Sequence, residues 1–191
     1  MKTPSRIVTA LALLFLAVGL GLGVDGPAVA AVGEASPRPQ AVDLPPLPAG
    51  PPVLTVATDS GPRAFSLADL EAVGLKTLTA DLLWQGENGT YQGILLADLL
   101  RETGLAAAPA VEVEGLDGYR AIIPREDINT WDVLLATRRD GRPMAVRDKG
   151  PLRILYAMTP KQLLEVPQMD TRWVWMVRAI RAAPPPREGA R

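Results

Sequence analysis

Two segments at the start of the chain limit which part of it can fold into a compact domain. Residues 7–24 carry no charged side chain, they follow the basic residues Lys2 and Arg6, and a small-x-small pattern ends at Ala30. This order is typical of a secretory signal peptide, so we expect export to the periplasm or the medium with cleavage after Ala30. The uncharged run is also just long enough to span a bilayer. An uncleaved anchor is therefore the alternative, and only then do we expect contact with a membrane.

Proline-rich segments flank the region that is expected to fold. Residues 31–52 contain seven prolines and show neither helical nor strand periodicity, which is typical of an extended spacer. Residues 184–191 are expected to form a disordered tail. Between them lie residues 53–183, about 130 residues, which is the ordinary size of one domain with its own hydrophobic core.

Two residue types are missing from the chain, and their absence excludes most catalytic chemistry. There is no cysteine and no histidine. Without cysteine the chain has no disulfide, thiolate nucleophile, iron–sulfur ligand or covalent haem attachment. Without histidine it lacks the most frequent general base and any Ser-His-Asp triad. Zinc sites depend on these same residue types, so we expect no metal site.

The charge balance gives no sign of a nucleic-acid-binding protein. Of 20 lysines and arginines and 21 acidic residues, residues 1–30 hold two bases and one acid, which leaves a formal charge of −2 after cleavage. Proteins that bind nucleic acid usually show a basic stripe and a high isoelectric point. We therefore expect no nucleic-acid partner.

Short apolar runs and two helical patterns alternate irregularly along residues 53–183. The expected strands cover residues 53–58, 76–84, 110–114, 119–123, 132–138, 152–156 and 173–180. A capping-box pattern at Ser66 and Asp69 predicts a helix over 66–74. Leucines at helical spacing predict a second helix over 95–103. This irregular order favours an α+β fold, a single domain built on mixed sheets.

Five sequence blocks occur in an order that is characteristic of one family. They are Trp84 with YQGILLADLL at 91–100, DGYRAIIP at 117–124, LLATRRDGRPM at 134–144, DKGPLRI at 148–154 and RWV at 172–174. In this order they resemble the oxidoreductase molybdopterin-binding domain family, and in particular its short exported members. The resemblance covers residues 63–180. It implies a truncated, single mixed-sheet domain of the sulfite-oxidase molybdopterin-binding type.

The resemblance also implies candidate residues for a binding cleft. Relatives use basic residues near these blocks around the pterin phosphate, and here Lys149, Arg153 and Arg172 stand in the matching blocks. The planar fork of an arginine suits phosphate or carboxylate. Tyr119 is expected to line the cleft with its ring in the core and its hydroxyl at the rim. The alternative for each arginine is a salt bridge with one of the many acidic residues.

The chain departs from the family pattern at the residues that carry the chemistry. Full-length relatives hold molybdenum with a cysteine thiolate, which this chain lacks, and their cofactor loop is shortened here to residues 83–91. Residues 159–164 stand where relatives have a glycine-rich loop. The signal also has no Arg-Arg pair, so it does not indicate the twin-arginine route by which folded molybdopterin proteins leave the cytoplasm.

We therefore expect a non-catalytic module that binds a periplasmic partner protein or a small anionic ligand through Tyr119, Lys149, Arg153 and Arg172. No cofactor is expected, and no catalytic residue is assigned. The first alternative is a molybdopterin-dependent oxidoreductase, or a subunit of one, that holds the pterin without a protein ligand to the metal. The second is a hydrolase that uses carboxylates alone. Its candidate residues are Glu112, Glu114, Asp117 and Asp127.

Overall fold

A computed structural model of the protein describes residues 36–82 and 84–184. The predicted signal peptide and residues 185–191 of the predicted tail lie outside these ranges. Among the described residues, no helix is long and apolar enough to cross a membrane.

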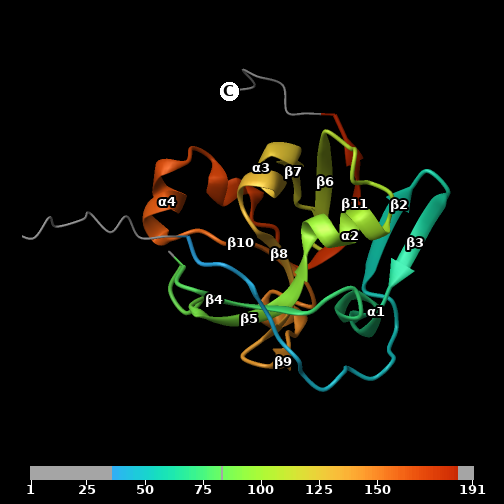
Figure 1. The fold of residues 1–191 in the computed structure, drawn as a ribbon, viewed down its shortest axis with the longest axis horizontal. Helices are drawn as coiled ribbons and strands as arrows, with labels where there is room; N and C mark the ends of the chain where they lie inside the picture. The colour runs from blue at the N-terminus through green and yellow to red at the C-terminus, as the bar shows by residue number, and fades with distance from the viewer. Residues whose placement is uncertain (1–35, 83, 185–191) are drawn as a thin grey trace, which may run out of the picture. The chain divides into compact units, whose positions relative to one another are not determined.

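Most of the described chain forms two sheets (Figure 1). The six-stranded sheet is antiparallel throughout, in the order β1-β4-β5-β8-β10, with β9 also paired to β8. Its strands are β1 (Gln40–Ala41), β4 (Lys76–Ala80), β5 (Gly89–Leu95), β8 (Val133–Arg139), β9 (Arg142–Pro143) and β10 (Arg153–Tyr156). The five-stranded sheet has the order β3-β2-β11-β6-β7, and only its pair β2–β11 is parallel. Its strands are β2 (Leu54–Thr58), β3 (Gly61–Phe65), β6 (Ala110–Gly115), β7 (Arg120–Pro124) and β11 (Val177–Ala183).

Four short helices and two 3₁₀ turns connect the strands. The helices are α1 (Leu67–Glu71), α2 (Leu96–Glu102), α3 (Arg125–Thr130) and α4 (Pro160–Glu165), and the turns are η1 (Val146–Asp148) and η2 (Met169–Arg172). The expected capping box is present at the start of α1, where the Ser66 side chain accepts from the Asp69 amide. The α+β prediction is confirmed. The sequence did not predict α3 or α4.

Two predicted strands are shorter in the structure than expected. The strand expected over 76–84 ends at Ala80. The strand expected over 173–180 begins only at Val177, because Met176 has a φ of 52° and a left-handed residue interrupts an extended strand. Trp173 and Trp175 therefore lie in an irregular segment before β11.

Part of the segment expected to be a spacer belongs to the domain instead. Within residues 31–52, Gln40 and Ala41 form β1 and pair with β4. The Val42 amide then donates to the Leu75 carbonyl, and the Arg138 guanidinium donates to the Pro45 carbonyl. An edge strand leaves its backbone groups unpaired, so a short extended stretch can add to β4 without strand periodicity of its own.

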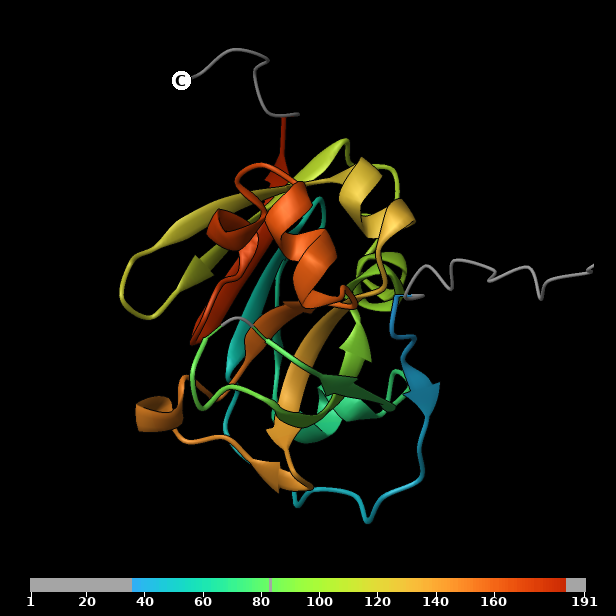
Figure 2. The same cartoon turned by 90° about the vertical axis from the view of Figure 1, so that its left-hand side faces the viewer.

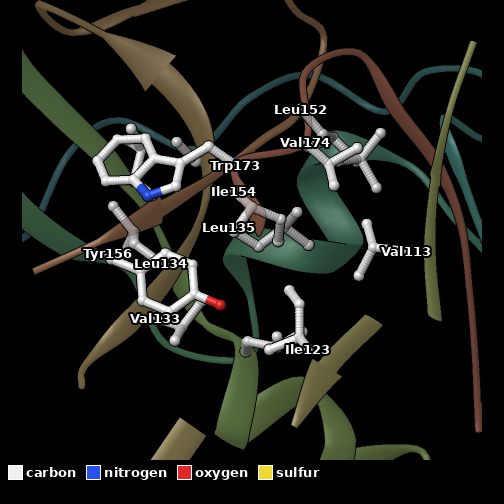
Figure 3. Close-up of a cluster of buried hydrophobic side chains, with 14 of the residues drawn as sticks. Val113, Ile123, Val133, Leu134, Leu135, Leu152, Ile154, Tyr156, Trp173 and Val174 are labelled. Carbon is white, nitrogen blue, oxygen red and sulfur yellow. The ribbon is translucent and has the colours of Figure 1, made fainter. Parts of the chain in front are cut away.

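The core lies between the two sheets. Figure 3 shows Val113 and Ile123 of the five-stranded sheet in one cluster with Leu135 and Ile154 of the six-stranded sheet. Each of these side chains is fully buried. Close packing also explains Gly93 in β5, where an added Cβ would lie 2.2 Å from the Leu135 carbonyl oxygen. The chain there needs a residue without a side chain.

Candidate functional site

An aromatic pocket of about 280 Å³ opens where three distant parts of the chain meet. We call it the tryptophan pocket, and it is lined by Trp84, Asp117, Tyr119, Asp170, Trp173 and Trp175. Trp84 follows β4, two of the residues come from the hairpin between β6 and β7, and the other three lie in η2 and just after it. Figure 2 shows this hairpin projecting on the side where β11 begins and where the chain passes after β4.

Ring packing holds the tryptophans in fixed positions. The Trp84 ring centroid lies 5.1 Å from that of Trp173 and 6.4 Å from that of Trp175. Trp173 also stacks on Tyr156, with 6.0 Å between centroids and 25° between planes. These are favourable aromatic geometries. Trp173 is buried and Trp175 half-buried, so the first belongs to the core and the second to its rim.

Two polar atoms of the tryptophans that line the pocket lack a hydrogen-bond partner among the described residues. The indole Nε1 atoms of Trp173 and Trp175 are buried and find no acceptor among the described residues. Buried N–H groups are nearly always paired with protein or ordered water. Because both Nε1 atoms are closed to solvent, a buried water is the partner that would satisfy them.

A cluster of charged residues, which we call the Glu87 cluster, lies next to Trp175. Glu87 accepts a hydrogen bond of 2.7 Å from Lys149 and one of 2.5 Å from Arg153. The Tyr91 hydroxyl accepts from Arg153 at 3.2 Å and donates to the Glu87 carbonyl at 2.7 Å. Lys149 Nζ lies 3.8 Å from the Trp175 ring centroid, within cation–π range. The cluster therefore lies against Trp175, one of the residues that line the tryptophan pocket.

The pKa of Glu87 predicts how the cluster responds to acid. Burial by itself would raise the pKa of Glu87, but hydrogen bonds and positive charge from Lys149 and Arg153 hold it below the ordinary value of 4.5. The folded state thus binds fewer protons than the unfolded state. Glu87 therefore stabilises the fold above its unfolded pKa, and this stabilisation is lost as pH falls through its folded pKa.

We expect the difference in free energy of unfolding between the protein and Glu87→Gln to have its largest value at pH 7 and to shrink below pH 4.5. Urea titrations at several pH values would measure it, and a pH-independent difference would contradict the assignment.

A second buried group joins Arg172 to the core. Arg172 donates to both carboxylate oxygens of Asp127, at 2.7 and 2.8 Å, and the Tyr156 hydroxyl donates to the same carboxylate at 2.9 Å. Burial and the Asp127 charge raise the pKa of Tyr156, so its hydroxyl stays protonated. This arrangement fixes the ring on which Trp173 stacks.

The structure divides the four residues predicted from the sequence between two places. Lys149 and Arg153 meet at Glu87, whereas Arg172 pairs with Asp127. Tyr119 lines the tryptophan pocket, but it is 44% exposed, so its ring does not lie in the core as expected. Its hydroxyl donates to the Thr171 carbonyl at 2.6 Å. Sequence reasoning missed Glu87 and Asp170 as parts of the site. It noted the tryptophans only as a family block and as strand residues.

The carboxylates proposed for a hydrolase form separate groups. Glu112 and Glu114 pair with Arg120 on the five-stranded sheet. Asp127 pairs with Arg172, and Asp117 lines the tryptophan pocket. Residues 36–82 and 84–184 contain no group of three or more His, Cys, Asp or Glu side chains placed to hold a metal ion. Glu112 and Glu114 do lie together, but Arg120 contacts both, and Arg178 and Arg181 pair with them as well, so both carboxylates are held in ion pairs.

Comparison with known proteins identifies the domain. The family model described as the oxidoreductase molybdopterin binding domain matches residues 54–162, which is more than half of the chain. No curated protein matches. The matched range runs from β2 into α4 and includes the Glu87 cluster, and it ends before Asp170, Trp173 and Trp175. The chain therefore belongs to the oxidoreductase molybdopterin binding domain family, with its sulfite-oxidase-like fold.

Proposed function

We propose that the protein is an exported, periplasmic member of this family that does no redox chemistry and binds a ligand or a partner protein. The observation that carries the proposal is the set of side chains that the chain offers to a cofactor. The domain keeps its family's fold, while the chain has no cysteine or histidine. The basic residues that would hold a phosphate are already paired with carboxylates.

The residues present do not fit the molybdenum-bearing cofactor. No thiolate can reach the metal, because the chain contains no cysteine. Lys149 and Arg153 contact Glu87 at 2.7 and 2.5 Å, so a phosphate would compete with a carboxylate already in place. Arg172 is engaged by Asp127 in the same way. At such distances the attraction within a partly buried ion pair is several kcal/mol, and we derive no reaction step through the cofactor.

One observation favours the alternative, a molybdopterin-dependent oxidoreductase or a subunit of one. Arg153 is 1% exposed, and its Nε and Nη2 atoms have no hydrogen-bond partner among the described residues. An anionic group could accept from both, which is how arginine binds phosphate. A pair of ordered waters would satisfy them equally well.

Metal and pterin content of the purified protein separates the two functions. We expect no molybdenum or tungsten above the buffer blank in protein isolated from the periplasm of a host that makes the cofactor. We expect no oxidised-pterin fluorescence either. A molybdoenzyme produced in the same host is the control for cofactor supply. Stoichiometric molybdenum would refute the non-catalytic proposal, and pterin without metal would indicate a carrier.

A further inference from the structure

The tryptophan pocket has a charge opposite to the one that the sequence suggested for the site. Its two charged lining residues, Asp117 and Asp170, are both acidic, and the described residues that line it include no lysine or arginine. Asp117 accepts a hydrogen bond from the Tyr119 amide. Neither carboxylate takes part in any of the ion pairs formed by the described residues. The pocket therefore presents two uncompensated negative charges.

The walls of the pocket add a second feature that attracts cations. The face of an indole or phenol ring carries negative electrostatic potential, and several such rings around one space form an aromatic cage. Trp84, Trp173 and Trp175 supply three rings here, and Tyr119 supplies a fourth. Lys149 already lies 3.8 Å from the Trp175 centroid, which shows that this ring accepts a cation within the fold.

The neighbouring Glu87 cluster does not cancel the charge of the pocket. Lys149 and Arg153 carry two positive charges, and Glu87 offsets one of them. The cluster thus carries one net positive charge next to Trp175, whereas two carboxylates line the pocket itself. Because the attraction falls with distance, a cation in the pocket is governed by Asp117 and Asp170.

We propose that the tryptophan pocket binds a small organic cation of the quaternary-ammonium type. This inference rests on the proposed binding function and names its class of ligand. The rings and the two carboxylates would take the cation. Pockets for drug-sized ligands begin at about 300 Å³. A pocket of about 280 Å³ therefore suits a ligand smaller than a drug, such as a small organic cation.

Choline is a suitable probe, and its neutral isostere 3,3-dimethylbutan-1-ol is the matched control. Both would be titrated into the protein expressed from its full sequence, at constant ionic strength, with tryptophan fluorescence and calorimetry as readouts. We expect choline to bind about tenfold more tightly than the isostere, because the two differ in the charge alone. Equal affinities, or no response to choline, would overturn the inference. Binding of inorganic phosphate in place of choline would overturn it as well and would restore an anionic ligand.

A pair of variants locates the binding. Asp170→Asn removes one exposed carboxylate of the pocket and is expected to weaken choline binding severalfold. Asp148→Asn removes an exposed carboxylate outside it and is expected to leave choline affinity unchanged. Equal effects of the two would place the cation elsewhere and overturn the assignment. Molybdenum content is measured on the same preparation, so failure to bind choline in metal-free protein rejects only the cation inference.

Discussion

Replacement of Arg153 with alanine is expected to lower the free energy of unfolding by about 3–5 kcal/mol. Arg153 is 1% exposed and donates to the Glu87 carboxylate and to the Tyr91 hydroxyl. Its removal leaves Glu87, itself 8% exposed, with Lys149 as its remaining partner. An incompletely compensated buried carboxylate is costly. Equilibrium urea denaturation, followed by tryptophan fluorescence, would measure the loss.

Two further variants test the cause of that loss. Arg147→Ala removes an arginine whose side chain is 87% exposed, and we expect a change within about 0.5 kcal/mol. The double variant Glu87→Leu/Arg153→Met removes both charges and should recover much of the stability, because a buried ion pair is often no better than apolar residues of similar volume. A loss below about 1 kcal/mol for Arg153→Ala would instead show that the arginine faces a ligand cleft.

Much of the fold was predictable because its signals are local. The hairpin of β6 and β7 follows from two apolar runs around Leu116-Asp117-Gly118, and the strands form where expected. The start of α1 follows from the Ser66 capping box. A capping box also begins α4, where Thr159 and Gln162 bond reciprocally and Pro160 occupies the first turn. The pattern lies in residues 159–164, which the family resemblance compares only with a glycine-rich loop of relatives.

The site could not be predicted because its contacts join distant residues. Glu87 lies 62 residues from Lys149 and 66 from Arg153, and no periodicity links them. The resemblance identified the bases as residues of a phosphate cleft. Folding places a carboxylate against each of them, which the sequence does not encode in any local pattern. Likewise Trp84 meets Trp173 and Trp175 through contacts between distant segments. The Ile154 amide, for example, donates to the Val174 carbonyl between the two tryptophans.

The proline-rich segment shows the same dependence on a distant contact, through a second buried ion pair. Arg138 donates to both oxygens of Glu71, at 2.8 and 2.5 Å, and to the Pro45 carbonyl at 2.9 Å. The Thr137 hydroxyl donates to the same carboxylate at 2.6 Å. The side chains of Arg138 and Glu71 are 6% and 7% exposed. One ion pair thus anchors a segment that the sequence marks as a free spacer.

Glu71→Ala is therefore expected to destabilise the protein by about 3–5 kcal/mol, because it leaves the Arg138 charge buried without its carboxylate. It should also release residues 36–47, which would show as faster hydrogen exchange at the Val42 amide, now bonded to the Leu75 carbonyl. Glu102→Ala, which breaks an exposed pair with Arg63, is the control and should change neither quantity. If stability falls while Val42 exchange stays slow, the pairing of β1 with β4 holds the segment without help from Arg138. The ion pair would then serve the core alone.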